Sequence, residues 1–341
     1  MVYSIGLLLC FALIHLIATS IYATPQKNNN LSTVRGIPKP LFSPFGLLPS
    51  TLTDPPINAV VPAGQCQFTK KPLAATLLSK IQISPDSYVL RFGLPDPLKP
   101  LGLSTCACIL AAITPDGDEE AVVRPYTPIS TNRDIGTFDL LIKAYPDGKA
   151  SSAITSLEVG SNKVSFLHIP PNVKIQYPFD QPKFIGMIAG GTGITPMMQA
   201  LHALLGEYDE EERDVPAPKV SLLYGSKTYE HSLARSTLDD WSKIVNIVGR
   251  EKRFTINHVI SQDSTEYPSV DEEESHSVMS GHINKALIER SFPSAGFGRD
   301  VKIFVCGPPA LYDAVCGPRE EKEITGILGE LGYTADQVVK F

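Results

Sequence analysis

Short aliphatic runs alternate with turn-forming sequences between residues 68 and 182. The runs cover residues 73–83, 88–92, 106–113, 137–145 and 163–169. Segments rich in Pro, Asp and Gly, such as TPDGDEE and YPDGK, separate them, and one short helix is expected near residues 151–157. Closely spaced strands with so little helix predict an antiparallel β-barrel domain over residues 68–182.

From residue 183 onward the pattern changes to strands that alternate with helices. Strands are expected at 184–189, 220–224, 254–260 and 301–306, and helices at 196–205, 233–244 and 283–290, with helical sequence after the last strand. This alternation predicts an α/β domain over residues 183–341, built on a mostly parallel sheet with helices on both faces. The acidic segment 262–279 is expected to be a solvated loop.

Residues 1–23 predict a membrane anchor, because positions 4–23 hold twenty residues without Asp, Glu, Lys or Arg. A cleaved secretory signal is the alternative, with Ile21-Tyr22-Ala23 as the cleavage site. No Lys or Arg precedes the apolar stretch and several follow it, which favours an uncleaved anchor with the following side cytoplasmic. Residues 24–67, rich in Pro, Asn, Ser and Thr, predict a tether between membrane and catalytic body.

Charge and the spacing of Cys and His argue against nucleic-acid binding, a disulfide framework and a metal site. A net charge of −6 over 341 residues, with the acidic excess in residues 184–341, argues against a nucleic-acid binder. The six cysteines do not suggest a disulfide framework, and Cys106 and Cys108 are interpreted as buried strand thiols. No His or Cys spacing indicates a metal site.

Residues 124–130 (RPYTPIS) form the first motif with candidate chemistry, directly after an expected strand. Arg124 could bind a phosphate bidentately, Tyr126 could lie against a flat ring, and Thr127 could donate to a ring nitrogen. These residues alone do not decide between such a binding site and an ordinary turn with two prolines and an exposed arginine.

Residues 140–145 (LLIKAY) and 147–152 (DGKASS) form the second motif. The strand could present backbone groups to the edge of a heterocycle. The Gly-Lys-x-Ser-Ser turn opens a helix whose free N–H groups suit a pyrophosphate. A strand, a turn and an N-capped helix without a ligand is the alternative.

The third and fourth motifs follow strands of the α/β domain. Residues 189–197 (AGGTGITPM) predict a tight strand-to-helix turn, with Thr195 as N-cap and Pro196 as first helical residue. The turn is consistent with dinucleotide binding, although it is not GxGxxG. Residues 304–309 (FVCGPP) could let a nicotinamide reach past Cys306, or Cys306 could simply be buried.

Together and in this order, the four motifs resemble the cytochrome-b5 reductase family, within the ferredoxin-reductase-like flavoproteins. The resemblance spans roughly residues 70–341, and includes YGSKT at 224–228 and the terminal LGYTADQVVKF. The apolar N-terminus with its tether resembles membrane-anchored fungal members, some of which sit on the mitochondrial outer membrane.

The resemblance implies FAD in the barrel and NADH, with NADPH left open, on the α/β domain. Tyr126, Thr127, Lys143 and Cys306 would lie at the reacting rings. The implied cofactor-binding residues are Arg124, Pro125, Tyr126, Thr127, Ile142, Lys143, Tyr145, Gly148, Lys149, Ser151, Ser152, Gly190, Gly191, Thr192, Gly193, Thr195, Pro196, Gly225, Cys306, Gly307 and Pro308.

Three positions depart from the family pattern. Ala150 stands where Met is usual and predicts a looser phosphate turn, and residues 168–172 (HIPPN) replace a GPxG-like turn. His231 stands where family members often have an acidic residue, whose carboxylate repels the 2′-phosphate of NADPH. A histidine would not repel that phosphate, but the adjacent Glu230 could take the place of the missing acid.

The implied activity is hydride transfer from NADH to FAD, then single-electron transfer to a haem acceptor such as cytochrome b5. The implied location is the mitochondrial outer membrane or the endoplasmic reticulum, facing the cytosol. A related reductase with a quinone or another carrier as acceptor, and a catalytically inactive membrane-anchored FAD-binding module, are the alternatives.

Overall fold

The computed structural model describes residues 42–43, 46–206, 217–247, 252–262 and 275–341. The predicted anchor at residues 4–23 lies outside these ranges, as do residues 24–41 and 44–45 of the predicted tether. None of the helices in the described ranges is long and apolar enough to cross a membrane.

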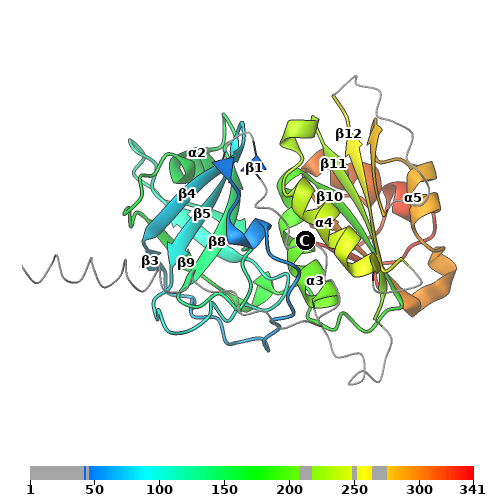
Figure 1. The fold of residues 1–341 in the computed structure, drawn as a ribbon, viewed down its shortest axis with the longest axis horizontal. Helices are drawn as coiled ribbons and strands as arrows, with labels where there is room; N and C mark the ends of the chain where they lie inside the picture. Colours follow the sequence, from blue (N-terminus) through cyan, green and yellow to red (C-terminus); the bar gives the residue numbers. More distant parts are fainter. Residues whose placement is uncertain (1–41, 44–45, 207–216, 248–251, 263–274) are drawn as a thin grey trace, which may run out of the picture. The chain divides into compact units, whose positions relative to one another are not determined.

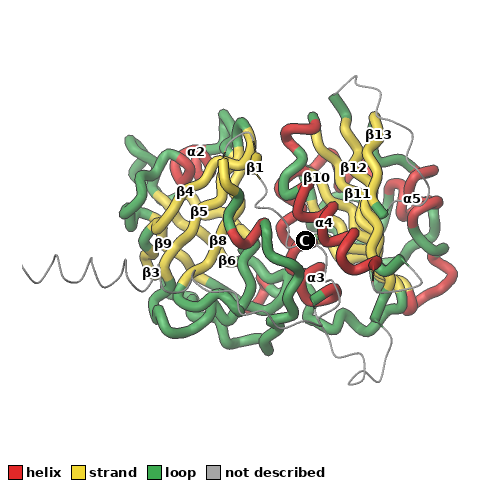
Figure 2. The backbone as a smooth tube through the Cα atoms, in the orientation of Figure 1, coloured by secondary structure: helices red, strands yellow, loops and turns green. Residues whose placement is uncertain are grey.

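Antiparallel strands build the first domain (Figure 1). One sheet has the order β3-β9-β6-β7 and the other β4-β5-β8. The strands are β3 (Leu73–Ala75), β4 (Leu77–Ser84), β5 (Ser87–Gly93), β6 (Ile109–Ile113), β7 (Val122–Tyr126), β8 (Thr137–Lys143) and β9 (Val164–Leu167). In Figure 2 this domain is almost entirely strand and loop, with the short helix α2 (Lys149–Thr155) at one end. The predicted antiparallel first domain is confirmed.

Four phenylalanines form the centre of this barrel. Phe68, Phe92, Phe138 and Phe166 are fully buried, with ring centroids 5.0–5.6 Å apart in five pairs. Tilted and edge-on packing of aromatic rings stabilises such a core beyond its buried area. The strands alternate buried and less buried positions, as in β6, because successive side chains of a strand point to opposite faces.

Two details of the strand prediction are wrong in this domain. The run at residues 73–83 is two strands, because the chain changes sheets at Thr76: β3 pairs with β9 and β4 with β5. Cys106 lies in a turn with φ of 63°, before β6 begins at Ile109. The two cysteines therefore do not share one face of a strand.

Six parallel strands form the sheet of the second domain, in the order β13-β12-β11-β10-β14-β15. They are β10 (Phe184–Gly190), β11 (Lys219–Ser226), β12 (Phe254–Ile260), β13 (His276–Ser280), β14 (Val301–Cys306) and β15 (Val338–Lys340). The helices are α3 (Ile194–Leu205), α4 (Arg235–Ile247), α5 (Lys285–Ser291), α6 (Pro309–Val315) and α7 (Gly326–Glu330).

Both faces of this sheet are covered, as predicted. Met187 belongs to the apolar cluster under α3 and α4, whereas the next residue, Ile188, belongs to the cluster under α5 and α6. Figure 1 shows α3 and α4 over one face of the sheet. The central strands β10 and β14 are consequently buried on both sides over most of their length, which explains their nearly continuous apolar sequences.

Two strands of this sheet were not predicted. Part of the expected loop 262–279 is β13, which pairs with β12; residues 263–274 lie outside the described ranges. The last residues form β15, which pairs with β14, where helical sequence was expected. Both are short edge strands, so their sequences carry little periodicity of their own.

The tether prediction is wrong for residues 48–60, here called the arm, because they pack on both domains. Leu52 is 1% exposed. Thr51 donates to Asp139 of β8 (3.0 Å), Thr237 of α4 donates to the Leu52 carbonyl, and the Trp241 indole donates to the Asp54 carbonyl (2.8 Å).

Short elements complete the described chain. They are β1 (Phe42–Ser43), β2 (Gly46–Leu47), and 3-10 helices at Ser50–Leu52, Pro170–Asn172, Gly191–Gly193 (η3), Tyr229–His231 (η5) and Ala295–Asp300.

Leu52→Ala tests whether the arm belongs to the folded body. We expect the free energy of unfolding to fall by about 2–5 kcal/mol, since the change deletes a fully buried side chain. Urea denaturation followed by the fluorescence of Trp241, which contacts the arm, measures it. Leu98→Ala is the control: that side chain is 84% exposed, and its loss should cost less than about 0.5 kcal/mol. Equal effects of the two changes would contradict an anchored arm.

Candidate active site

The RPYT motif lies on β7 itself rather than after a strand. Arg124 and Pro125 are exposed, and Tyr126 and Thr127 are half-buried. The Arg124 guanidinium donates to the Val123 carbonyl (2.8 Å), and no carboxylate within the described ranges pairs with it. Burial raises the pKa of Tyr126 to about 12, so its hydroxyl stays protonated and can donate a hydrogen bond at neutral pH.

The end of β8 presents a positioned lysine. The Lys143 ammonium pairs with Asp86 of the β4–β5 turn at 2.8 Å. Although burial opposes ionisation, hydrogen bonds from Lys143 and Ser87 hold the pKa of Asp86 below its ordinary value. Ile142 is buried, whereas Tyr145 is 47% exposed, with the Lys143 Nζ 6.0 Å from its ring centroid.

The turn after β8 leads directly into α2. Gly148 precedes Lys149 at its N-terminus, and no side chain caps the helix. The Ser151 hydroxyl donates to the Gly148 carbonyl (3.1 Å) and the Ser152 hydroxyl to the Tyr145 carbonyl (2.8 Å). Both serines therefore brace the turn, which leaves the backbone N–H groups of the first helical turn for an anion.

Ala150 faces the barrel core, where it is 3% exposed. Its small side chain therefore changes core packing, and it does not lie on the outer side of the phosphate turn.

The GGTG segment forms η3 between β10 and α3. Gly191 has φ of +53° and only open space where a Cβ would stand. At Gly193 a Cβ would overlap the carbonyl oxygen of Cys306, so only glycine fits. Gly193, not Thr195, is the N-cap residue. Thr195 is the second residue of α3 and donates to the Thr192 carbonyl (3.2 Å), and Pro196 is the third.

Cys306 ends β14 beside this turn. Burial raises the pKa of its thiol to about 11, so Cys306 is neutral at pH 7 and is no thiolate nucleophile. Gly307 and Pro308 continue the loop, and a Cβ at Gly190 would meet Pro308 at 3.0 Å. Gly225 of β11 is in register with Gly190. The three segments thus meet at the carboxyl edge of the sheet, where such folds bind ligands.

Several contacts hold the barrel motifs against this edge. Strand β8 contacts η3. The Gln199 amide of α3 donates to the carbonyls of Pro128 (2.7 Å) and Ser130 (2.6 Å), directly after the RPYT motif. The Cys106 thiol donates to the Pro196 carbonyl at 3.3 Å. These contacts, with the close approach of Gly193 to Cys306, connect the chain after the RPYT motif, β8, the GGTG turn and the Cys306 loop.

Three residues of this arrangement were not predicted from the sequence. Asp86 holds Lys143, Gln199 joins α3 to the barrel, and the hydroxyl of Tyr224 donates to the Gly191 carbonyl (3.1 Å) while accepting from the Leu233 N–H. Tyr224 stands in the YGSKT segment, whereas nothing local to the sequence marks Gln199.

His231 joins the two domains. Its Nδ1 is 2.7 Å from the Thr228 hydroxyl, and its Nε2 is 3.5 Å from the Asp86 carboxylate of the barrel. Lys143 and His231 thus contact the same carboxylate oxygen. His231 stands at the position expected to discriminate between ribose with and without a 2′-phosphate. In the structure its side chain contacts Asp86 of the other domain.

Comparison with known proteins agrees with this geometry. Residues 74–166 match the family model described as oxidoreductase FAD-binding domain, and residues 187–317 match the oxidoreductase NAD-binding domain. NADH-cytochrome b5 reductase 2 of Aspergillus oryzae is 35% identical over 269 residues, covering 77% of this chain and 76% of the relative. That of Scheffersomyces stipitis is 36% identical over 272 residues, covering 78% and 82%.

The chain belongs to the NADH-cytochrome b5 reductase family.

The solved structures show the same fold. The cytochrome b5 reductase domain of Ulva prolifera nitrate reductase superposes with a TM-score of 0.62 at 28% identity, covering 84% of this chain and all of that one. The CS-b5R domains of human Ncb5or superpose with a TM-score of 0.59 at 21% identity, covering 79% of this chain and 68% of that one.

This member of the reductase family is therefore an oxidoreductase with an FAD-binding and an NAD-binding domain, and its cofactors are FAD and NADH. Its residues fit these groups. The uncapped first turn of α2 and the unpaired Arg124 guanidinium suit phosphates. The open space over Gly191 leaves room for close approach of a ligand.

Gly193→Ala tests the contact between η3 and the Cys306 loop in the reductase. The added Cβ must push the two loops apart and so displace the nicotinamide relative to the flavin. A displacement of roughly 1 Å should make NADH reduce the bound flavin about 100-fold more slowly. Stopped-flow absorbance of the holoenzyme measures the rate. Gly93→Ala on β5 is the control, because its Cβ would find Leu78 at an ordinary 3.6 Å. An unchanged rate in Gly193→Ala would contradict the tight contact.

Proposed function

We propose that this chain transfers reducing equivalents from NADH through FAD to cytochrome b5 or a similar haem protein. The observation that carries the proposal is the junction of the barrel motifs with the carboxyl edge of the parallel sheet: β8 contacts η3, and η3 contacts the Cys306 loop. Membership of the NADH-cytochrome b5 reductase family supports cytochrome b5 as the acceptor.

The barrel side of the site would bind FAD. Arg124 and Lys149 would contact its phosphates together with the N–H groups at the start of α2. Tyr126 would lie along the flavin, where its protonated hydroxyl can donate, and Thr127 would donate to a ring heteroatom. Ile142 and Tyr145 would border the ring. Bound FAD supplies the acceptor for a hydride and a carrier that releases electrons one at a time.

The residues of the sheet edge would orient NADH. Thr192 would face the flavin, Gly190, Gly191 and Gly193 would let the dinucleotide approach the backbone, and Gly225, Gly307 and Pro308 would line its path. The Cys306 thiol, neutral at pH 7, would contact the nicotinamide ring without reacting with it. The protein contributes orientation and electrostatics here, and hydride transfer itself requires no acid or base from it.

Lys143 is proposed to fix the negatively charged dinucleotide. Asp86 binds the ammonium group of Lys143 and so restricts the otherwise flexible lysine side chain. The shared carboxylate also ties Lys143 to His231 on the other domain. Both contacts support a position for Lys143 where the two cofactors would meet.

Lys143→Met tests this role in the full chain. Removing a charge-assisted contact should weaken the binding of NADH about tenfold or more. The KM for NADH should rise accordingly, and the FAD content should stay unchanged. Lys163→Met is the matched control, since Lys163 pairs with Asp116 on the barrel surface at 3.2 Å. Stopped-flow absorbance with NADH, and reduction of cytochrome b5 against reduction of a quinone, measure the activity.

The outcomes separate the alternatives. Flavin that NADH does not reduce in the unsubstituted protein would support the inactive FAD-binding module and contradict the proposal. Faster reduction of the quinone than of cytochrome b5 would identify the other acceptor class. An equal KM for Lys143→Met and Lys163→Met would remove Lys143 from the NADH site.

We also propose that residues 4–23 attach the protein to the mitochondrial outer membrane or the endoplasmic reticulum, with the catalytic domains in the cytosol. The uncharged length of this segment supports it, as do the basic residues that follow. The full chain should resist alkaline carbonate extraction of cell membranes, and a chain lacking residues 1–23 should be released. Mature protein that begins at Thr24 would contradict an uncleaved anchor.

A further inference from the structure

Tyr224 carries a buried hydroxyl at the carboxyl edge of the parallel sheet. The residue lies on β11, pairs with Ala189 of β10 and is 0% exposed. Its ring belongs to the apolar cluster under α3 and α4, whereas its hydroxyl hydrogen-bonds with the backbone of two different loops. Burying a hydroxyl costs free energy unless it is hydrogen-bonded, so these bonds belong to the folded structure.

The two bonds use the donor and an acceptor of the same oxygen atom. The hydroxyl donates to the Gly191 carbonyl of η3 at 3.1 Å and accepts the Leu233 N–H at 3.1 Å. Burial raises the pKa of Tyr224 well above its ordinary value, so the proton for the first bond is present at neutral pH. A single atom therefore joins η3 to the chain between η5 and α4.

Both loops lie where a dinucleotide would bind. In sheets of this kind the turn after the first strand takes the pyrophosphate, and the end of the next strand takes a ribose. Here η3 follows β10, and residues 229–234, called the 229–234 segment, follow β11. His231 of this segment also reaches Asp86 of the barrel at 3.5 Å. The Tyr224 hydroxyl thus spans the pyrophosphate side and the ribose side of the sheet edge.

The 229–234 segment ends in a strained residue. Ala234 has φ of 55°, a left-handed conformation in which its Cβ crowds the following carbonyl. Strained residues persist where surrounding contacts hold them, and they cluster at functional sites. Two contacts precede Ala234: the Leu233 N–H donates to Tyr224, and the Ser232 hydroxyl lies 3.4 Å from Nδ1 of the buried His258. The shorter of these two contacts is the one to Tyr224.

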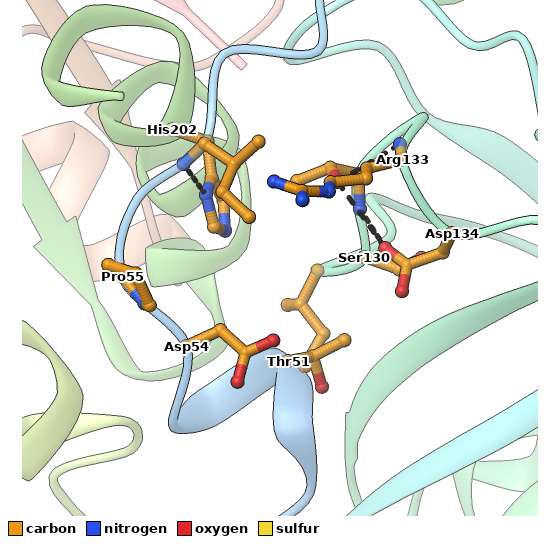
Figure 3. Close-up of a pocket in the computed structure, with 10 residues that line it drawn as sticks. Thr51, Asp54, Pro55, Ser130, Arg133, Asp134 and His202 are labelled. Atoms are coloured by element: carbon orange, nitrogen blue, oxygen red, sulfur yellow. Dashed lines mark hydrogen bonds between the residues drawn. The ribbon is translucent and has the colours of Figure 1, made fainter. Parts of the chain in front are cut away.

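Helix α3, on the other side of η3, is held by contacts that do not involve Tyr224. Gln199 binds two carbonyls of the barrel, and Figure 3 shows the ring of His202 hydrogen-bonded to the arm. Loss of the Tyr224 hydroxyl should therefore leave the helix in place and release the two loops from each other.

We propose that Tyr224 is a positioning residue for NADH, because its hydroxyl fixes the spacing between η3 and the 229–234 segment. The inference rests on the proposed function, since both loops act through bound NADH. With the bridge in place, the loops are ordered before the dinucleotide arrives. Without it, binding has to order them, and the cost of this ordering weakens the affinity. Bound NADH then holds both loops itself, so the transfer step changes little.

Tyr224→Phe tests the bridge in the full-length, FAD-loaded protein, because it removes one oxygen and keeps the buried ring. Isothermal titration calorimetry with NAD⁺, which cannot reduce the flavin, should show about tenfold weaker binding. In stopped-flow absorbance, the NADH concentration for half-maximal flavin reduction should rise by a similar factor. The rate at saturating NADH should change less than about threefold. Hydrogen exchange should become faster in the 229–234 segment, and NAD⁺ should restore its protection.

Two variants serve as controls. Tyr333→Phe is the matched one: Tyr333 is also buried and donates to the Pro293 carbonyl, but it belongs to the cluster on the other face of the sheet. It loses a hydrogen bond of the same kind and should leave NAD⁺ affinity unchanged. Ser232→Ala removes the longer contact with His258 and should weaken NAD⁺ less than Tyr224→Phe does.

Three outcomes would overturn the role of Tyr224. They are equal NAD⁺ affinity in Tyr224→Phe and Tyr333→Phe, loss of FAD from Tyr224→Phe, and a slower rate at saturating NADH with unchanged affinity. Flavin that NADH does not reduce in the unsubstituted protein would instead contradict the proposed function. Calorimetry with NAD⁺ does not depend on flavin reduction, so the two failures are distinguishable.

Discussion

The close approach of Gly193 to the carbonyl of Cys306 sets the geometry of the cofactor site. No side chain fits at this contact, so the turn out of β10 runs directly against the loop that leaves β14. The two strands are neighbours in the parallel sheet and end at the same level. Thr192 and Cys306 consequently flank one region of the carboxyl edge, and Gly191, with its positive φ, keeps the space above the turn open. The sheet positions both loops without a mobile element.

The barrel is aligned to this edge by polar contacts of specific geometry rather than by a large charge attraction. Gln199 binds two backbone carbonyls, which fixes the chain directly after the RPYT motif. The Asp86 carboxylate contacts Lys143 of its own domain and His231 of the other. Lys143 is only 16% exposed in this pair, so water screens it less than a surface ion pair. The arm adds hydrogen bonds to β8, α3 and α4.

Long buried strands and glycine turns could be predicted from the sequence, because their patterns are local. The predicted bounds of β12 and β14 agree with the structure to the residue, since β14 is a short, mostly apolar run and β12 begins with alternating apolar and polar residues. β15 has three residues and depends on its pairing with β14, so its own sequence could not identify it. The same holds for the arm: Leu52 stands among prolines and polar residues, and contacts with residues far along the chain, Thr237 and Trp241 among them, bury that segment. The motif positions were predicted, but the partners Asp86 and Gln199 follow from tertiary contacts, and the roles of the individual cofactor residues remain predictions.

Helix α3 connects these constraints. Eleven of its twelve residues are buried, and Gln199 is the exception. Thr195, Gln199 and His202 are its polar residues after Ile194, spaced four and three apart, which places them on one face of the helix. Each directs a hydrogen bond outside the apolar core: Thr195 to η3, Gln199 to the barrel and His202 to the arm. Because apolar side chains of suitable volume specify a unique arrangement less strictly than polar contacts do, these three bonds help to specify the register of the helix. Through these bonds the cofactor turn, the barrel and the arm are all held on a single helix.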